Sequence, residues 1–337
     1  MSKTKFGICP SVNSGESAWD YSLNFERMKE VVRICEDLGF ESVWSPDHLM
    51  TGNDFQGFEA WTLLAGLSQV TERMRLGTLM TCITHRAPAV LAKMIATLDV
   101  MSNGRVELGI GTGWCGFEQL AYNLPWEEVP KARIDRLAEG LEIIRGMWTH
   151  DSFTFKGRYY SVNEAICAPK PIQKPTPPIL IGGKGEKLLL KVVAKYADGW
   201  NIDELTTEDY AHKLEVIRNH CKTLGTNYDH IEKSLETYLL ISDKPEHQKI
   251  LVDWTNRRWE NRNSAILRER ERSGRKPHTV TLDDIRHKYI FGSVEQVIDR
   301  FSEYVDIGVQ RFMIYFMDYP TLNSIVPFAK QVVPSLK

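Results

Sequence analysis

Short apolar runs alternate with amphipathic helical patterns along the whole chain, and this alternation limits the possible folds more than any other feature. Eight runs have the length and composition of buried strands. They span residues 6–9, 42–44, 76–83, 106–110, 179–181, 199–202, 234–242 and 311–316. Helical patterns, with apolar residues three and four positions apart, span residues 23–38, 58–70, 88–101, 133–148, 186–196, 207–224, 294–307 and 320–333. This order predicts parallel strands joined by helices.

Two α/β architectures accommodate such an order: a doubly wound open sheet and a closed (β/α)8 TIM barrel. The spacing of the units and the length of 337 residues favour the barrel. Because no linker divides the sequence, we predict a single domain over residues 1–337. A charged helical stretch at 245–272, followed by polar residues to 286, predicts a helical insertion around 245–290, and residues 153–162 predict a small hairpin. In such a barrel, functional residues lie at the C-terminal ends of the strands.

Composition narrows the class of partner. The 42 Lys and Arg nearly balance the 44 Asp and Glu, so the net charge of −2 gives no basic surface for nucleic acid or an anionic membrane. No apolar run reaches the ~18 residues of a membrane span, and the first residues do not resemble a secretory signal. Six scattered cysteines indicate reduced thiols, and the nine histidines form no metal-binding pattern. We therefore expect a cytoplasmic protein that acts on a small molecule and carries no metal.

An acidic residue and a histidine follow the second predicted strand, at Asp47 and His48. Because imidazole titrates near neutral pH, His48 could give or accept a proton, or hydrogen-bond a polar heterocycle. The alternative is that this histidine only caps the strand or helps the loop to turn. After the third strand, His85 and Arg86 could contact a cofactor or simply cap the next helix.

Glycines at alternate positions follow the fourth strand, at Gly109, Gly111 and Gly113. This arrangement lets the backbone approach a flat ligand or a phosphate closely. The run is not a Rossmann fingerprint, because it follows the fourth strand rather than the first and is interrupted by Trp114.

A second glycine-rich segment follows the fifth strand and contains Gly182, Gly183 and Gly185. It precedes the helix expected from residue 186, and N–H groups at a helix N-terminus bind phosphate. Lys184 adds a positive charge, so we predict a phosphate site here, although an ordinary turn between strand and helix is the alternative. The spacing of a Walker A loop is absent.

Four segments of the sequence match a known family pattern. The longest covers residues 87–114 and reads APAVLAK, then TLDVMSNGRVELGIGTGW from residue 97, while the others lie at 155–160, 170–183 and 194–201. Together they resemble the luciferase-like monooxygenase superfamily of flavin and deazaflavin enzymes, over most of the chain. The resemblance implies a (β/α)8 barrel with an insertion and a flavin-type ring that lies across the strand ends. It also implies a bulge with a non-proline cis peptide late in the third strand, at Cys82–Ile83.

Two cofactors divide this superfamily: FMN and the deazaflavin coenzyme F420, which carries hydride and does not activate oxygen. Asp47–His48 resembles the pair that the F420 members carry, and Thr81-Cys82-Ile83 resembles F420-dependent alcohol dehydrogenases. The resemblance therefore implies an oxidoreductase that transfers a hydride between F420 and a small organic substrate. The alternative is an FMN-dependent two-component monooxygenase with a separate reductase. A barrel that binds a ligand without catalysis is a third reading.

The resemblance also implies roles for individual residues. His48 would donate or remove a proton as hydride moves, and Asp47 would orient it or contact the polar edge of the ring. Trp114 stands where the family's dehydrogenases carry a carboxylate, and it would line the substrate pocket. The residues expected to bind the cofactor are Thr81, Cys82, Ile83, Gly111, Gly113, Gly182, Gly183, Lys184 and Gly185.

Two further expectations come from the resemblance. The F420 tail carries glutamates, so a basic groove near Lys184 and Lys187 would favour F420 over FMN. Members of the superfamily often form dimers through the second and third helices, which implies a homodimer. Phe58, Trp61 and Leu64 could serve as the contact, although burial in the core explains these three residues equally well.

Overall fold

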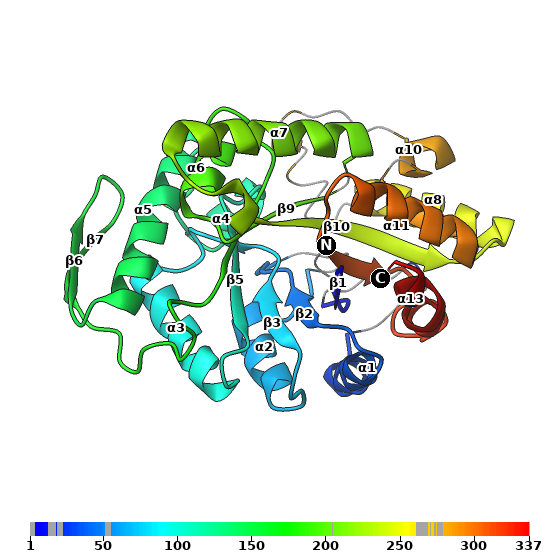
Figure 1. Cartoon of the computed structure of the whole chain (residues 1–337), viewed down its shortest axis with the longest axis horizontal. Helices are drawn as coiled ribbons and strands as arrows, with labels where there is room; N and C mark the ends of the chain where they lie inside the picture. Colours follow the sequence, from blue (N-terminus) through cyan, green and yellow to red (C-terminus); the bar gives the residue numbers. More distant parts are fainter. Residues whose placement is uncertain are drawn as a thin grey trace.

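Eight parallel strands close into a barrel at the centre of the molecule (Figure 1). This computed structural model describes residues 4–12, 18, 23–50, 55–203, 205–260, 269, 271–272, 274, 279–286 and 288–336. The barrel strands are β1 (Lys5–Ile8), β2 (Ser42–Ser45), β3 (Arg75–Thr78), β5 (Val106–Gly111), β8 (Ile179–Gly182), β9 (Gly199–Asp203), β10 (Glu232–Ile241) and β12 (Arg311–Phe316). Each pairs with the next in that order, and β12 pairs with β1 to close the ring. The predicted (β/α)8 barrel is confirmed.

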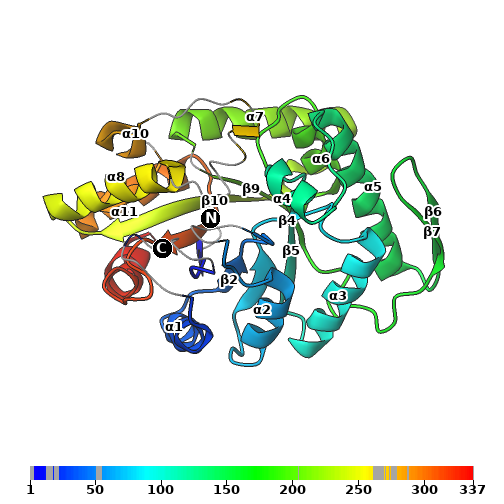
Figure 2. The same cartoon turned by 180° about the vertical axis from the view of Figure 1, so that it is seen from behind.

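Helices surround the barrel on its outside (Figures 1 and 2). They are α1 (Phe25–Asp37), α2 (Ala60–Ser68), α3 (Pro88–Met101), α4 (Gly116–Ala121), α5 (Pro130–Thr149), α6 (Leu189–Tyr196), α7 (Thr207–Leu224), α11 (Val294–Asp306), α12 (Ile325–Pro327) and α13 (Val333–Ser335). A 3-10 turn spans Tyr228–His230, and a π-helical turn, Phe328–Val332, joins α12 to α13. Among the described helices, none is long and apolar enough to cross a membrane.

Local sequence signals set several helix ends. The Thr206 side chain accepts a hydrogen bond from the Asp209 N–H ahead of α7, and Gly225 ends that helix with a left-handed φ of 69°. Ser293 and Gln296 form a reciprocal capping box at the start of α11. Such caps satisfy backbone groups that have no partner inside the helix.

Two parts of the chain lie outside the regular barrel. The predicted hairpin is present as β6 (Phe153–Lys156) and β7 (Ser161–Ala165), at the left edge of Figure 1. The segment predicted as an insertion holds α8 (Pro245–Glu260), α10 (Leu282–Arg286) and β11 (Ile290–Gly292), which pairs with the end of β10. The predicted helix at 245–272 is present over Pro245–Glu260 and at residues 269, 271 and 272, while residues 261–268 and 270 lie outside the described residues.

The third strand was predicted as one run over 76–83, and this is wrong in detail. β3 ends at Thr78, and a separate short strand, β4 (Thr81–Cys82), continues beside β5. From Gly77 to Thr81 the chain advances four residues, while β5 advances three, from Glu107 to Ile110. One extra residue must therefore bulge out of the ladder.

The non-proline cis peptide lies within this bulge, at Leu79–Met80, and not at Cys82–Ile83 as the resemblance implied. The reason is the pairing of β4: Thr81 and Cys82 are in register with β5, so the irregular backbone falls before them. The bulge that the resemblance implied in this strand is thus present, but three residues earlier than expected.

A second boundary differs from the prediction. The helix expected from residue 186 begins at Leu189, after a turn over residues 186–188. The Leu190 N–H donates to the Gly185 carbonyl, so the chain turns before it becomes helical. The glycines after β8 therefore do not open α6 directly. The last helical segment likewise begins at Ile325 rather than at residue 320.

A buried ion network fills the N-terminal end of the barrel. The Glu107 carboxylate on β5 pairs with Arg311 of β12 (Nη1 to Oε2, 2.6 Å) and with Arg75 of β3. Arg311 also pairs with Glu232 of β10 (Nη2 to Oε2, 2.8 Å). Burial would raise the pKa of Glu107, but the charges of Arg311 and Arg75 outweigh it and lower that pKa to about 2. The network joins the first residues of strands and leaves the opposite end of the barrel for a ligand.

We predict that Glu107→Gln lowers the free energy of unfolding by about 3–5 kcal/mol, because it leaves buried arginine charge without its partner. In the wild type the stabilisation from Glu107 is complete above the pKa of an unfolded glutamate, 4.5, and is lost as the pH falls toward about 2. Urea unfolding across this range measures both effects. Asp135→Asn, which removes the exposed Lys131–Asp135 pair, should cost less than about 1 kcal/mol. Equal losses in the two variants would contradict the prediction.

Candidate functional site

A cavity of about 710 Å³ opens at the C-terminal ends of the barrel strands. This volume is in the range of small-molecule and cofactor sites. It is lined by residues at or just after the ends of β2, β4, β5, β8, β9, β10 and β12, together with residues of the α8–α10 segment. Ten of the predicted site residues line it: Asp47, His48, Thr81, Cys82, Gly111, Gly113, Trp114, Gly182, Gly183 and Lys184.

Two predicted residues are not among those that line the cavity. Ile83 is fully buried in the core, where its side chain packs against Gly140 of α5 so closely that a Cβ at Gly140 would overlap it. Gly185 belongs to the turn ahead of α6 and accepts a hydrogen bond from the Leu190 N–H.

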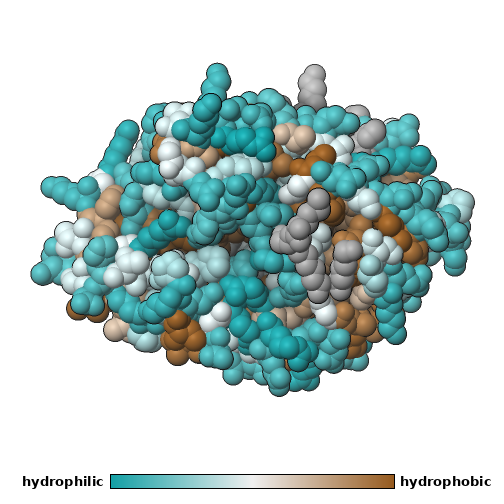
Figure 3. Space-filling model, in the orientation of Figure 1, coloured by the Kyte–Doolittle hydropathy of each residue, from teal (hydrophilic) through white to brown (hydrophobic). Residues whose placement is uncertain are grey.

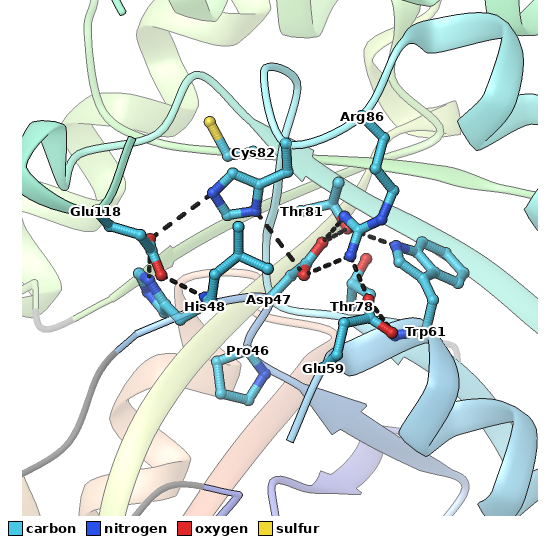
Figure 4. A network of polar contacts seen from close by, with 12 residues as sticks. Pro46, Asp47, His48, Glu59, Trp61, Thr78, Thr81, Cys82, Arg86 and Glu118 are labelled. Carbon is cyan, nitrogen blue, oxygen red and sulfur yellow. Dashed lines mark hydrogen bonds and ion pairs between the residues drawn. The ribbon is translucent and has the colours of Figure 1, made fainter. Parts of the chain in front are cut away.

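His48 is held by a carboxylate that the sequence analysis did not single out. Its Nδ1 lies 2.9 Å from Oε2 of Glu118, which stands in the first turn of α4. The other oxygen of Glu118 accepts the backbone N–H groups of Leu49 and, at 2.8 Å, Met50 (Figure 4). The ring of Trp114 meets the His48 ring edge to face, with the centroids 5.4 Å apart. The carboxylate that contacts the His48 ring is thus Glu118 rather than Asp47.

Asp47 makes a second set of polar contacts, next to those of His48 and Glu118 (Figure 4). Its carboxylate accepts the Thr81 hydroxyl at 2.7 Å and a two-pronged contact from Arg86, at 2.6 and 3.0 Å. Trp61 of α2 donates its ring N–H to the same Thr81 oxygen at 3.1 Å, and Arg86 also binds Glu59 at the N-terminus of α2. The network therefore fixes the end of β2 to β4 and α2.

The charges around Asp47 determine its protonation. Burial would raise the pKa of its carboxyl, but the neighbouring His85 and Arg86 outweigh burial and hold that pKa well below its usual range. Asp47 is consequently a carboxylate at any ordinary pH. It can accept hydrogen bonds and hold charge, but it does not supply a proton.

Gly111 at the end of β5 and Gly182 at the end of β8 form a glycine edge along the floor of the cavity. A Cβ at Gly111 would lie 3.6 Å from the Gly182 carbonyl and 3.7 Å from the Met80 Cβ, so β5, β8 and the bulge meet here. Gly113 (φ 74°) and Gly183 (φ 126°) have left-handed backbone, which favours glycine. The Gly183 N–H is already engaged, because it donates to the Asn201 carbonyl at 3.1 Å.

Comparison with known proteins identifies the family of the chain. The family model described as luciferase-like monooxygenase matches residues 4–311. The chain belongs to the luciferase-like monooxygenase family. One relative of this luciferase-like protein is the F420-dependent glucose-6-phosphate dehydrogenase of Amycolatopsis mediterranei, 26% identical over 316 residues that cover 90% of this chain and 92% of the relative.

Two solved structures share the fold of this luciferase-like chain. An F420-dependent secondary alcohol dehydrogenase in complex with an F420–acetone adduct matches with a TM-score of 0.82 at 22% identity, over 99% of both chains. A long-chain alkane monooxygenase matches with a TM-score of 0.81 at 16% identity, over 100% of this chain and 91% of that one. At these identities the likeness shows the common barrel.

Glu118 is the residue of the site that the sequence analysis missed. A signal for it exists: it lies four residues after Trp114, in the helix that follows the glycine edge, so a helical turn brings it back over the strand ends. Met80 was missed because the bulge that turns it into the cavity was placed too late. His85 and Arg86 were named as possible cofactor contacts, and the structure places Arg86 against Asp47 and His85 along the cavity wall.

We predict that Arg86→Met costs about 3–5 kcal/mol of unfolding free energy, because it leaves the Asp47 charge buried with one cation fewer. Burial then dominates, and the pKa of Asp47 rises above its unfolded value. The Asp47 contribution changes sign: in the wild type it is lost as the pH falls, whereas in the variant it is lost as the pH rises.

Urea unfolding from about pH 3 to about pH 7 follows this reversal. Arg218→Met is the matched control, because Arg218 forms an exposed pair with Glu215. Parallel pH profiles for wild type and Arg86→Met would show that Arg86 does not control the Asp47 carboxyl.

Proposed function

We propose that the protein is an oxidoreductase that transfers a hydride between coenzyme F420 and a small organic substrate. The observation that carries the proposal is the position of His48, held by Glu118 at a cavity where the backbone of Gly111 is bare. Membership of the family, and a relative of matching length that is named as F420-dependent, support the same reading.

The residues present suit a flat ring. Gly111 offers backbone without a side chain, and the side chain of Met80 from the bulge lies over Gly182 and adds an apolar contact. Bound F420 supplies a two-electron hydride carrier. His48 donates a proton to the substrate or removes one, and Trp114, about half exposed beside it, restricts where the substrate lies. The chain contributes by holding donor and acceptor together and by excluding water.

The outer part of the cavity suits an anionic tail. Lys184 lines the cavity, and Lys187 is exposed on the turn that follows it. These two cations, with the N–H groups around the start of α6, are the groups proposed to bind the phosphate. Lys184 and Lys187 would also attract the glutamates of the F420 tail, which FMN lacks.

Equilibrium binding of F420 and of FMN, followed by tryptophan fluorescence at fixed salt, tests the proposal. We expect F420 to bind at least tenfold more tightly, a difference of about 1.4 kcal/mol. A preference for FMN would overturn it in favour of a two-component monooxygenase with a separate reductase, which oxygen consumption would then measure. If neither cofactor binds, the protein is a barrel without this chemistry.

We predict that Gly111→Ala lowers the affinity for F420 at least tenfold, because the added methyl group occupies the floor where the ring lies. The same methyl group meets protein atoms at 3.6 Å or more, which is ordinary van der Waals contact, so the fold tolerates it. The cofactor titration is therefore paired with thermal unfolding, and the melting temperature should stay near that of the wild type. Unchanged affinity in a folded variant would place the ring elsewhere.

We also propose that the protein forms a homodimer through α2 and α3. A groove of about 600 Å³ lies along these helices, and Val90 and Met101, which line it, are 55% and 51% exposed. Figure 3 shows an apolar patch over α3. An apolar groove with exposed side chains suits contact with the same surface of a second copy related by a two-fold axis. Of the residues expected from the sequence, Leu64 is fully buried and Trp61 nearly so, so α3 supplies the exposed contacts.

We predict that Val90→Asp converts a dimer into a monomer, because it buries a charge in an apolar interface. Light scattering coupled to gel filtration measures the mass. Val129→Asp is the matched control, since Val129 is 61% exposed but does not line the groove. A monomeric wild type, or a Val90→Asp dimer, would contradict the proposal.

A cytoplasmic location is part of the proposal. All six cysteines are buried and none forms a disulfide, which is typical of proteins in a reducing compartment.

A further inference from the structure

We propose that Glu118 is the positioning residue of the site, which holds His48 with its proton on Nδ1, and that the buried His85 links Glu118 to Asp47. The five side chains form a chain of alternating partners that runs Arg86, Asp47, His85, Glu118, His48 (Figure 4). Use of the proton in a reaction rests on the proposed function, whereas the contact itself does not.

The contacts of Glu118 leave its carboxylate one orientation. Its side chain is 1% exposed, Oε1 accepts two backbone N–H groups of the loop after β2, and Oε2 faces His48 Nδ1 at 2.9 Å. Rotation of the carboxylate would break these bonds in a place that water does not reach. Burial would raise the pKa of Glu118, but His48 and the Met50 N–H outweigh burial and lower it, so the group is an anion.

This anion determines the tautomer of His48. A carboxylate can only accept a hydrogen bond, so Nδ1 of His48 must carry the hydrogen that lies between them. In the neutral ring Nε2 then carries no hydrogen, so it is the nitrogen that accepts the exchangeable proton and, in the protonated ring, gives it up. A carboxylate at Nδ1 also favours the protonated ring, so we expect removal of the Glu118 charge to weaken the hold of His48 on its second proton.

His85 occupies the space between the two carboxylates. Its side chain is 1% exposed, with Nδ1 3.8 Å from Oδ1 of Asp47 and Nε2 3.7 Å from Oε2 of Glu118. Both distances exceed a hydrogen bond, and neither ring nitrogen has a hydrogen-bond partner among the described residues. Without an imidazole here, two buried anions would face each other across a medium that screens charge poorly. His85 is thus placed to keep Glu118 ionised.

Other titratable groups line the same cavity: Lys184, Asp203, Glu236, Asp284, Lys288, Tyr238, Tyr289 and Tyr315. Asp47 and Arg86 form an ion pair beyond His85, and the thiols of Cys82 and Cys115 are buried in the cavity wall. Burial raises the pKa of Cys82 to about 11 and that of Cys115 to about 12, so both thiols are neutral in the range where histidine titrates. The contact of the Glu118 carboxylate with His48 Nδ1 is the one on which the proposal rests.

The test is a titration of the histidine side chains by NMR, on the full chain without cofactor and with labelled histidine. The His48 signal is assigned by its absence in His48→Gln. In the wild type we expect the Nδ1–H tautomer. Glu118→Gln should lower the pKa of His48 by about one unit or more, because the amide replaces the charge but keeps an acceptor. Glu118→Asp, which restores the charge, should recover part of the shift.

The matched control is Glu36→Gln. Glu36 is also buried and accepts backbone N–H groups, from Glu72, Arg73 and Met74, but it does not line the cavity. Its replacement should leave the His48 titration unchanged. A His48 titration that does not respond to Glu118→Gln in a folded protein would overturn the proposal. If that variant does not fold, an Nε2–H tautomer in the wild type would overturn it equally.

The link through His85 has its own test. His85→Gln should change the His48 titration in the wild type but not in a Glu118→Gln background, because the effect passes through Glu118. Equal effects in both backgrounds would show that His85 acts on His48 by another route. If His48 responds as expected but F420 does not bind, the proposed function is overturned and the role of Glu118 stands.

Discussion

The placement of buried charge decides which end of this barrel can bind a ligand. At the N-terminal end, Glu107 is neutralised by Arg311 and Arg75, and the paired charges fill the space between the first residues of the strands. At the opposite end, the carboxylates of Asp47 and Glu118 are paired by side chains of the loops and short helices that follow the strands. One end is thus closed by its own ion pairs, and the other keeps its polar groups along the wall of a cavity.

The sequence predicts the barrel well because period and order are local signals. Each strand is a short apolar run and each helix an amphipathic one, and parallel strands that alternate with helices have few ways to close. The same argument places Asp47, His48 and the two glycine segments at one end. Their placement follows from the order of the strands alone and does not depend on which side chains are in contact.

The details that the sequence did not predict depend on pairing between strands. The position of the bulge follows from the register of Thr81 against Ile110, which no property of residues 76–83 alone specifies. The late start of α6 follows from how the glycine segment is held to β9 through Gly183 and Asn201. Glu118 was missed for a related reason, since its contact with His48 joins residues 70 positions apart.

The extra residue between β3 and β4 has a consequence for how this site can change over generations or in the laboratory. With that residue removed, Gly77 and Thr81 could keep their partners on β5 with three residues on each strand, so the ladder would become regular and Thr81 and Cys82 would keep their present faces. The backbone that now brings Met80 into the cavity wall would instead be drawn into the strand. A single-codon deletion here would therefore change the lining of the cavity and leave the contact between Thr81 and Asp47 in place, whereas the same deletion in the hairpin of β6 and β7 would only shorten a projection on the outside.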